Sequence, residues 1–346
     1  MASTTTLTVV AAKIAATLTN YPAYVDLSDM TTEFWADVVN GGGDIRCYSD
    51  VGLTTELARE IVSCDTATDT GEMHVKVTSL TTTAVVYVTT DGSSSEPAST
   101  ATYGRNNVWS DYVGVYHLES LTLDSTGNGY TLTNNNTVAN IASQIGDGAD
   151  FTATNTNKTL TNATNFGMGT GTDITMQTWF SPYDVTDALE GITFFNNSTR
   201  DIKVGFFQDN GTISFRVERM FVNSDYHSYT HGMSDGDWAM LHMTWDNTNK
   251  ISYFNGGSVD NSTYSGNGSG TTGSNFTIGS EQNAGGTVRL WGSNKVDETR
   301  VRLGILSADW ITTEYNNQSA VGAFWTIADA GGGGGAATNP LALANF

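Results

Sequence analysis

Charged side chains, and basic ones above all, are scarce in this sequence. Only 15% of the 346 residues are charged, and 15 Lys and Arg stand against 36 Asp and Glu, which gives a formal net charge of −21. Such a chain repels polyanions, so nucleic acid is disfavoured as a partner, and anionic membrane surfaces are disfavoured for the same reason. The acidity is typical of a well-solvated surface, with cation binding as the alternative.

Long apolar segments and an export signal are also missing. No stretch reaches the roughly 18 apolar residues of a membrane span, and the Thr-rich start lacks a basic segment followed by an apolar core. We therefore expect a protein made in the cytoplasm of its host. Cys47 and Cys64 are too few for a disulfide framework, and cytosolic synthesis favours two reduced thiols over a pair.

Helical periodicity is nearly absent, whereas short alternating segments recur with turn signals between them. Alternation of apolar and polar residues predicts strands, for example at residues 74–77, 85–88 and 215–218. Asn-Gly and Asp-Gly pairs predict the tight turns between such strands. Two short helices are expected at residues 32–39, capped by Thr31 or Thr32, and 307–316, capped by Ser307.

The distribution of strands and turns predicts an all-β fold with two β-sandwich domains. A turn-rich segment at residues 92–97 closes the first block of strands. We expect a first β-sandwich at residues 1–108, a second at 109–328 and a Gly-rich tail at 329–346. Four large aromatic residues are expected to fill the space between the sheets of the second sandwich: Trp179, Trp238, Trp245 and Phe254.

The tail combines flexibility with apolar residues. Its five consecutive glycines, 331–335, lose much backbone entropy on ordering and bury little in return. Leu341, Leu343 and Phe346 are apolar and would suit insertion into a groove of a neighbouring subunit. The sequence therefore predicts assembly through this tail, and the alternative is a tail that folds back on its own second domain.

Four short motifs stand in order in the first block: YP at 21–22, VDLS at 25–28, DIR at 44–46 and TGE at 70–72. Together they resemble a small β-domain of unknown function that occurs in phage virion proteins and bacterial surface proteins. That domain commonly lies directly before a laminin-G-like domain. The resemblance runs from about residue 20 to residue 90 and implies a virion or cell-surface protein.

A second series of motifs fills the remainder of the chain. It comprises YVGVYHLE at 112–119, DSTGNG at 124–129, ITMQTWFSP at 174–182, the long segment 235–257, FTIGS at 276–280 and the segment 295–318. In this order they resemble the laminin-G, pentraxin and concanavalin-like lectin and glucanase superfamily. The resemblance implies that the second domain is a jelly roll.

Members of this superfamily often bind calcium where the first turn meets the last strand. The matching groups are Asp124 and Asn128 in DSTGNG, together with Asp297, so the resemblance implies a structural Ca²⁺ at these residues. Ca²⁺ takes about six to eight oxygen ligands, which acidic turns provide. The alternative is that Asp124 caps its own turn through backbone N–H groups.

Catalytic motifs are missing from the sequence. Glucanases of the superfamily carry a Glu-x-Asp-x-Glu strand, which does not occur here, and the consecutive Asp297 and Glu298 should point to opposite faces of a strand. Gly-x-Ser-x-Gly, His-Glu-x-x-His, Cys-x-x-Cys and phosphate-binding loops are also missing. The five histidines are expected at polar surface positions. We therefore expect no enzymatic activity.

These observations favour a bacteriophage virion structural protein, either a capsid decoration protein or a fibre- or tail-associated surface component. It would assemble with other virion subunits as a homo-oligomer, with attachment to host-surface glycans as a further role. The alternative is a carbohydrate-binding adhesin of a bacterial or phage surface. Four aromatic residues are candidates for stacking on sugars, with core or turn packing as the other interpretation of each: Tyr226, Tyr229, Tyr264 and Trp291.

Overall fold

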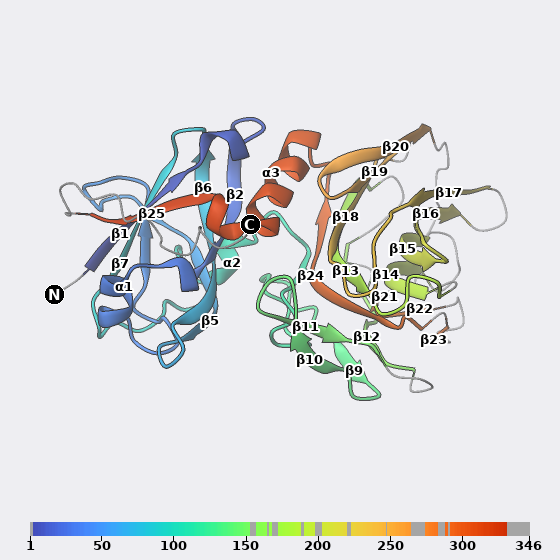
Figure 1. The fold of residues 1–346 in the computed structure, drawn as a ribbon, viewed down its shortest axis with the longest axis horizontal. Coiled ribbons are helices and arrows are strands. Elements are labelled where there is room, and N and C mark those ends of the chain that lie inside the picture. Colours follow the sequence, from blue (N-terminus) through green and yellow to red (C-terminus); the bar gives the residue numbers. More distant parts are fainter. Residues whose placement is uncertain are drawn as a thin grey trace, which may run out of the picture.

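The computed structural model of the protein consists mainly of antiparallel strands (Figure 1). It describes residues 3–152, 157–164, 166–167, 172–187, 190–197, 203–219, 223–246, 248–263, 274–282, 288–289 and 291–330. Two β-sandwiches lie side by side, and helix α3 (Ala308–Ser319) lies between them. None of the described helices is long and apolar enough to span a membrane. The predicted all-β class with two β-sandwiches is confirmed.

The first sandwich packs a five-stranded sheet against a three-stranded sheet. The larger sheet contains, in order, β25 (Trp325–Asp329), β1 (Ser3–Val9), β7 (Val85–Thr90), β3 (Arg46–Tyr48) and β4 (Glu56–Leu57). The smaller sheet contains β2 (Leu18–Asp26), β6 (Thr70–Leu80) and β5 (Arg59–Asp65). Helices α1 (Thr32–Asp37) and α2 (Arg105–Val108) lie in the connections. Alternate residues of β7 are buried, as expected of a strand with one face on a core.

The last strand returns to the first sandwich. β25 pairs with β1, with Leu7 opposite Ile327, and it lies as a red strand among blue ones in Figure 1. Phe324 and Trp325 complete the first hydrophobic core. The predicted range 109–328 for the second sandwich therefore differs at its end, because residues 325–328 belong to the first sheet.

The second sandwich packs an eight-stranded sheet against a seven-stranded sheet. The eight-stranded sheet contains β8 (Gly114–Tyr116), β10 (Ala139–Ala142), β11 (Asp147–Asp150), β13 (Ile174–Pro182), β18 (Ala239–Trp245), β19 (Asn249–Phe254), β20 (Gly257–Thr263) and β24 (Asn294–Leu303). The seven-stranded sheet contains β9 (Thr133–Asn135), β12 (Thr159–Asn162), β14 (Glu190–Asn197), β15 (Lys203–Asp209), β16 (Thr212–Arg219), β17 (Asn223–Thr230) and β21 (Ser274–Ile278). Strands β22 (Glu281–Gln282) and β23 (Val288–Arg289) form a separate pair.

The aromatic residues expected between these sheets divide into two groups. Trp245 is buried in the core and Phe254 packs against it, as predicted. Trp179 is buried on the opposite face of β13, where its Nε1 donates to Gln318 at 2.6 Å. Trp238 precedes β18 and is only half-buried, so its predicted burial is wrong.

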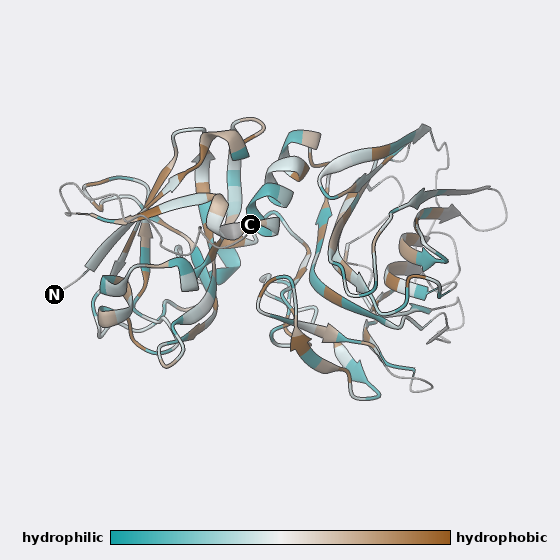
Figure 2. Cartoon of the chain, in the orientation of Figure 1, coloured by the Kyte–Doolittle hydropathy of each residue, from teal (hydrophilic) through white to brown (hydrophobic). Residues whose placement is uncertain are grey.

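Helix α3 is rich in polar residues and yet lies largely buried between the sandwiches; Figure 2 shows hydrophilic residues along it. Ser307 caps it as predicted, because its Oγ accepts a hydrogen bond from the Trp310 N–H at 3.1 Å. Trp310 and Ile311 join the first core. Asn317 accepts from the backbone N–H of Tyr24 and donates to its carbonyl, at 2.8 and 2.9 Å. The helix therefore ties the second sandwich to the first.

Candidate functional site

A group of buried charged residues lies where the two sandwiches meet. Its members come from β5 and β6 of the first sandwich and, on the other side, from the residue after β8, from β24 and from α3. Their side chains are at most 4% exposed. Buried charges persist only when they are paired or bind an ion. We call this group the junction cluster, and its members are Glu60, Glu72, His74, His117, Glu298, Arg300 and Glu314.

Strand geometry brings the first-sandwich members together. Glu72 and His74 are two residues apart on β6, so their side chains lie on the same face. Glu60 lies opposite His74 in the pairing of β5 with β6. Three ionisable groups thus face the second sandwich from neighbouring positions of one small sheet.

A β-bulge sets the second-sandwich members in place. Arg300 of β24 lies opposite Gln177, whereas Asp297, three residues earlier, lies opposite Trp179. The extra residue is Glu298, whose φ of +47° lies in the left-handed region. A bulge re-aims side chains, and here both carboxyl groups belong to the junction: burial, and then the charge of Glu298, raises the pKa of Asp297. Because Glu298 interrupts the alternation of the strand, the rule by which consecutive residues point to opposite faces does not apply to Asp297 and Glu298.

His117, directly after β8, lies at the centre of the cluster. Its Nδ1 is 2.5 Å from Glu298 Oε1 and 3.4 Å from Glu72 Oε1. Its Nε2 is 3.1 Å from Glu60 Oε2. The ring of His117 stacks on that of His74 with 4.6 Å between centroids, and His74 Nε2 is 2.9 Å from Glu72 Oε1. One imidazole therefore connects carboxylates of both sandwiches.

Arg300 extends the network to α3. Its Nε donates to Glu298 Oε2 at 3.0 Å, and its Nη1 donates to Glu314 Oε1 at 2.7 Å. Glu314 Oε2 is in turn 3.1 Å from Nε2 of His242, on β18. The guanidinium also lies over the ring of Trp109, 4.8 Å from its centroid. A chain of hydrogen bonds and ion pairs thus runs from His242 on β18 through Glu314 of the helix to Arg300 and Glu298.

Burial and neighbouring charges shift the pKa values in the cluster. Burial, reinforced by Glu298, raises the pKa of Glu72 well above its usual range. Burial alone would lower the pKa of His117, but the carboxylates of Glu298 and Glu60 raise it well above its usual range. Burial would raise the pKa of Glu298, but His117 and Arg300 hold it below its usual range. The cluster therefore shifts the pKa values of Glu298 and Glu72 in opposite directions.

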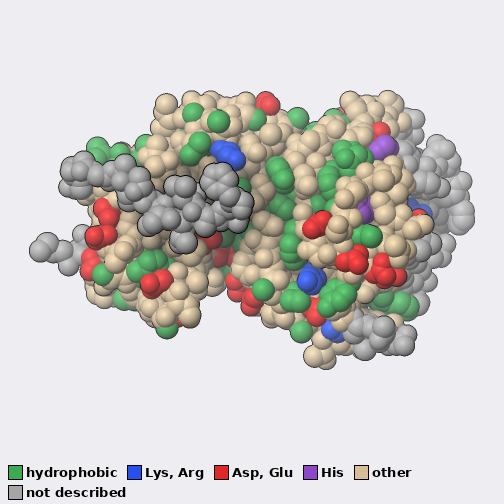
Figure 3. Space-filling view, viewed as in Figure 1, with side chains coloured by type: hydrophobic (Ala, Val, Ile, Leu, Met, Phe, Trp, Pro, Cys, Tyr) green, Lys and Arg blue, Asp and Glu red, His purple; other side chains and the backbone are tan. Residues whose placement is uncertain are grey.

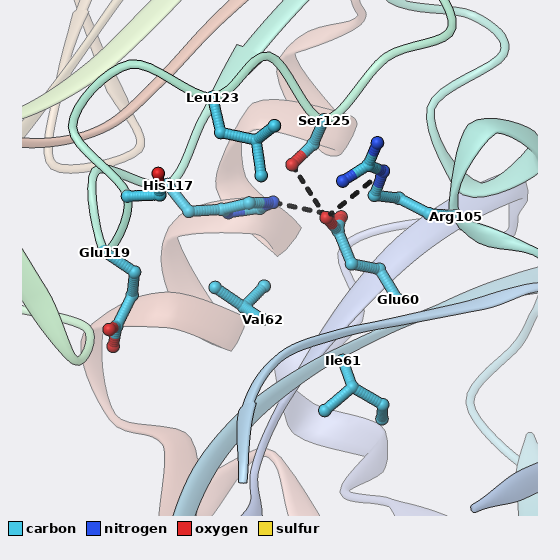
Figure 4. A pocket seen from close by; sticks show the side chains of 9 residues that line it. Glu60, Ile61, Val62, Arg105, His117, Glu119, Leu123 and Ser125 are labelled. Atoms are coloured by element: carbon cyan, nitrogen blue, oxygen red, sulfur yellow. Dashed lines mark hydrogen bonds and ion pairs between the residues drawn. The ribbon is translucent and has the colours of Figure 1, made fainter. Parts of the chain in front are cut away.

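A small cleft of about 70 Å³ reaches the cluster beside Glu60. Figure 4 shows the Glu60 carboxylate directed toward Ser125, Arg105 and His117. The Ser125 hydroxyl donates to it at 2.7 Å, the Trp109 indole N–H donates to it as well, and Arg105 approaches to 4.0 Å. A cleft of this size holds a few waters and is too small for a sugar ring.

The histidine prediction is partly wrong. His74, His117 and His242 are buried, at 0%, 4% and 0% exposure. Each depends on partners distant in sequence, which pattern reasoning does not locate. One signal was present: Glu72 and His74 occupy one face of a segment whose other face is apolar, a sign that this face also packs against something.

The predicted calcium ligands interact with different parts of the chain. Asp124 accepts hydrogen bonds from the N–H groups of Val115, Thr126 and Tyr130 at 2.8–3.2 Å, which is the turn-capping alternative. The Asn128 side-chain amide donates to backbone carbonyls. Asp297 Oδ2 accepts from the segment between β10 and β11. The donors around Asp124 do not fit a calcium ligand, and calcium itself stays a prediction.

The predicted sugar-stacking residues lie in different surroundings. Trp291 is 40% exposed. Tyr229 is half-buried and packs on Phe254, 5.1 Å between centroids. Tyr226 lies in β17 with its side chain outside the described parts. Tyr264 and the predicted assembly residues lie outside the described residues altogether: Leu341, Leu343 and Phe346.

A second exposed aromatic residue, Tyr183, lies close to Trp291. The N–H of Tyr183 donates to the carbonyl of Ser293 at 3.2 Å, which holds Tyr183 on the same edge of the sandwich as Trp291. Tyr183 is 51% exposed, and Nζ of Lys295 lies 5.5 Å from the centre of its ring. We call Tyr183, Trp291 and Lys295 the aromatic edge. The sequence analysis missed Tyr183, although it directly follows the motif ITMQTWFSP at 174–182.

Comparison with known proteins identifies the second domain. Residues 151–312 match the Laminin_G_3 family, described as the concanavalin A-like lectin/glucanases superfamily. No curated protein matches the chain. The resemblance of residues 20–90 to the β-domain of unknown function stays a prediction.

Several solved structures are similar at low identity. The binding domain of Paraclostridial Mosquitocidal Protein 1 shares 15% identity over 60% of this chain and 52% of that chain, with a TM-score of 0.48. Domain 4 of AbnA, a GH43 extracellular arabinanase from Geobacillus stearothermophilus, was solved in complex with arabinotriose. It shares 19% identity over 58% of this chain and 97% of that chain, with a TM-score of 0.46. The Botulinum neurotoxin serotype D ligand binding domain, solved in complex with N-acetylneuraminic acid, shares 12% identity over 60% of this chain and 51% of that chain, with a TM-score of 0.46. This chain spans about half the length of the toxin chains.

Proposed function

We propose that this protein, whose residues 151–312 form a concanavalin A-like lectin/glucanase domain, binds carbohydrate without cleaving it. The observation that carries the proposal is the aromatic edge, where Tyr183 and Trp291 are exposed on neighbouring segments of that domain. Large aromatic side chains are normally buried, so two exposed together call for a ligand.

The aromatic edge offers the groups that a sugar needs. Aromatic rings stack on the apolar face of a pyranose, and their position fixes the orientation of the ligand. Lys295 adds a cationic donor beside Tyr183. Charge complementarity favours an acidic sugar at this point, because the Lys295 ammonium can pair with a carboxylate.

The arrangement of carboxyl groups supports binding rather than hydrolysis. Glycoside hydrolysis needs two carboxyls about 5–10 Å apart with the sugar between them. The carboxylates of the junction cluster are at most 4% exposed, and those of Glu60, Glu298 and Glu314 are held by hydrogen bonds and ion pairs. Glu72 is the one member that lines a larger cleft of about 440 Å³ between the sandwiches, and its Oε1 contacts His74. The cluster is therefore suited to joining the two sandwiches.

A glycan array probed with the full chain tests the proposal. Binding should be retained by Tyr103→Ala, a matched control that removes an exposed aromatic residue of the first sandwich. Trp291→Ala and Tyr183→Ala should each weaken binding about tenfold, which corresponds to the loss of one stacking contact. Failure of every glycan to bind, or binding that neither substitution weakens, would contradict the proposal.

The setting that we propose is the surface of a bacteriophage particle, with the protein as a structural component of capsid, fibre or tail. Two features support it. On the face of the molecule that Figure 3 shows, acidic side chains outnumber basic ones, in line with the net charge of −21. β25 forms the edge of the first sheet, and an edge strand and a following tail are natural docking elements.

Deletion of residues 331–346 tests the assembly role. We expect the shortened chain to keep its melting temperature and to lose oligomer in light scattering coupled to size exclusion. An unchanged oligomer with a lower melting temperature would contradict it and favour a tail that folds back on its own chain. Detection of the protein in purified phage particles by mass spectrometry tests the setting itself.

A further inference from the structure

We propose that Glu72, His74, His117 and Glu298 bind a divalent transition-metal ion, Zn²⁺ by ligand chemistry, between the two β-sandwiches. Each residue presents one ligand atom, and the four atoms all lie within 4.8 Å of one another. Two ligands come from β6 of the first sandwich, and two, His117 and Glu298, come from the second sandwich. The ion would therefore join the sandwiches directly, independently of carbohydrate binding.

The contacts identify the four ligand atoms. Glu72 Oε1 lies near both imidazoles, at 2.9 Å from His74 Nε2 and 3.4 Å from His117 Nδ1. Glu298 Oε1 lies 2.5 Å from the same His117 Nδ1. Ligand atoms of a tetrahedral zinc site stand about 3.3 Å apart, given bonds of about 2.0–2.2 Å. The four groups need to separate by less than about 1 Å at their closest contacts to admit the ion.

The surrounding residues match the second layer of a metal site. His117 Nε2 faces the Glu60 carboxylate at 3.1 Å, so Nδ1, which lies 2.5 Å from Glu298 Oε1, is the ring nitrogen on the side of the proposed ion. A histidine ligand usually donates its other N–H to a carboxylate, which fixes the tautomer and the ring. Glu298 keeps Oε1 toward the centre because Arg300 Nε holds its Oε2 at 3.0 Å. Both outer contacts are already present.

The local charge also favours a cation. Five buried carboxyl groups gather at the junction: Glu60, Glu72, Asp297, Glu298 and Glu314. The basic groups that approach them are Arg300, Arg105 in the cleft, and the imidazole of His117. Buried negative charge without compensation is costly, and a dication offsets much of this excess.

Unpartnered polar atoms give a second, independent indication. Glu72 Oε2, His74 Nδ1 and Asp297 Oδ1 are buried and have no hydrogen-bond partner among the residues that the structure describes. Buried polar atoms normally have partners, and exceptions point to a missing ion or water. An ion at the centre, with its own ordered waters, would complete this network.

Metal analysis of the full chain tests the site with Zn²⁺ as the probe. After growth with zinc and desalting, we expect about one zinc ion per folded chain by plasma mass spectrometry. The double variant Glu72→Gln, His74→Gln should retain less than about a tenth of it. His227→Gln is the matched control, because it removes a half-buried histidine 3.6 Å from Asp260, where adventitious zinc would bind. Folded wild type without zinc, or equal zinc in wild type and double variant, would overturn the proposal.

Cobalt spectroscopy decides the matter if the double variant does not fold. Wild type stripped of metal and titrated with Co²⁺ should develop an intense visible absorption of four-coordinate cobalt that saturates at about one equivalent. A weak spectrum of six-coordinate cobalt, or no visible absorption, would overturn the proposal. In that case the carboxyl groups and imidazoles of the four residues are held together by hydrogen bonds alone.

Discussion

Substitution of Arg300 tests whether the junction cluster determines stability. Arg300→Met keeps the bulk of the side chain but removes the guanidinium that Glu298 and Glu314 share. Breaking a buried ion pair by removing one partner costs about 3–5 kcal/mol, because the other charge is left buried and unpaired. That is a large part of the roughly 5–15 kcal/mol of a typical domain. We therefore expect a loss of about 3–5 kcal/mol in the free energy of unfolding.

Urea denaturation followed by far-UV circular dichroism measures this loss, with a chelator present so that bound metal does not contribute. Arg302→Met is the control: it lies on the same strand, and in the described part of the chain Arg302 contacts the rings of Tyr112 and Trp310 but no carboxylate within ion-pair distance. The control should lose less than about 1 kcal/mol. A loss below about 1 kcal/mol for Arg300→Met, or equal losses for both variants, would show that the ion pairs of Arg300 do not stabilise the folded chain.

Three further predictions follow from burial. Cys47 and Cys64 are free thiols whose pKa values burial raises to about 12 and about 11, so both should react with iodoacetamide only after unfolding; rapid labelling of the native chain would contradict this. Burial raises the pKa of Glu190 to about 7, so the folded state keeps a proton that the unfolded state releases above about pH 4.5. Stability should therefore fall on the order of 1–2 kcal/mol between about pH 4.5 and 7, and Glu190→Gln should abolish this slope in urea titrations at each pH. Trp179→Ala should cost about 3–5 kcal/mol by the same denaturation, whereas Trp238→Ala should cost clearly less; equal losses would show that burial does not set the difference.

The local features of the fold could be predicted from the sequence. Alternation and turn residues predicted the strands, and Ser307 was identified as the cap of α3 because the hydroxyl precedes Ala308 and Asp309 in a helix-forming segment. These features depend on neighbours within a few residues. The jelly roll followed from a series of motifs in a fixed order, and residues 151–312 confirm it.

The junction could not be predicted in the same way. His117 and Glu298 are separated by 181 residues and meet only because β8 pairs with β24. The orientation of Glu298 depends on a bulge, and a one-residue insertion in a strand leaves no signal in alternation that is already polar. The return of β25 to β1 depends on long-range pairing of a short segment, and its placement with the second sandwich followed from nearness in sequence alone.

We propose above that the lectin-like domain binds carbohydrate without cleaving it. The most direct test is to titrate the full chain with the best glycan of the array in a calorimeter and then to analyse the same glycan by mass spectrometry. We predict saturable binding of about one glycan per chain and recovery of the glycan at its original mass. Shortened glycan, with turnover that is lost when one carboxylate is replaced, would contradict the claim, and so would the absence of any heat of binding.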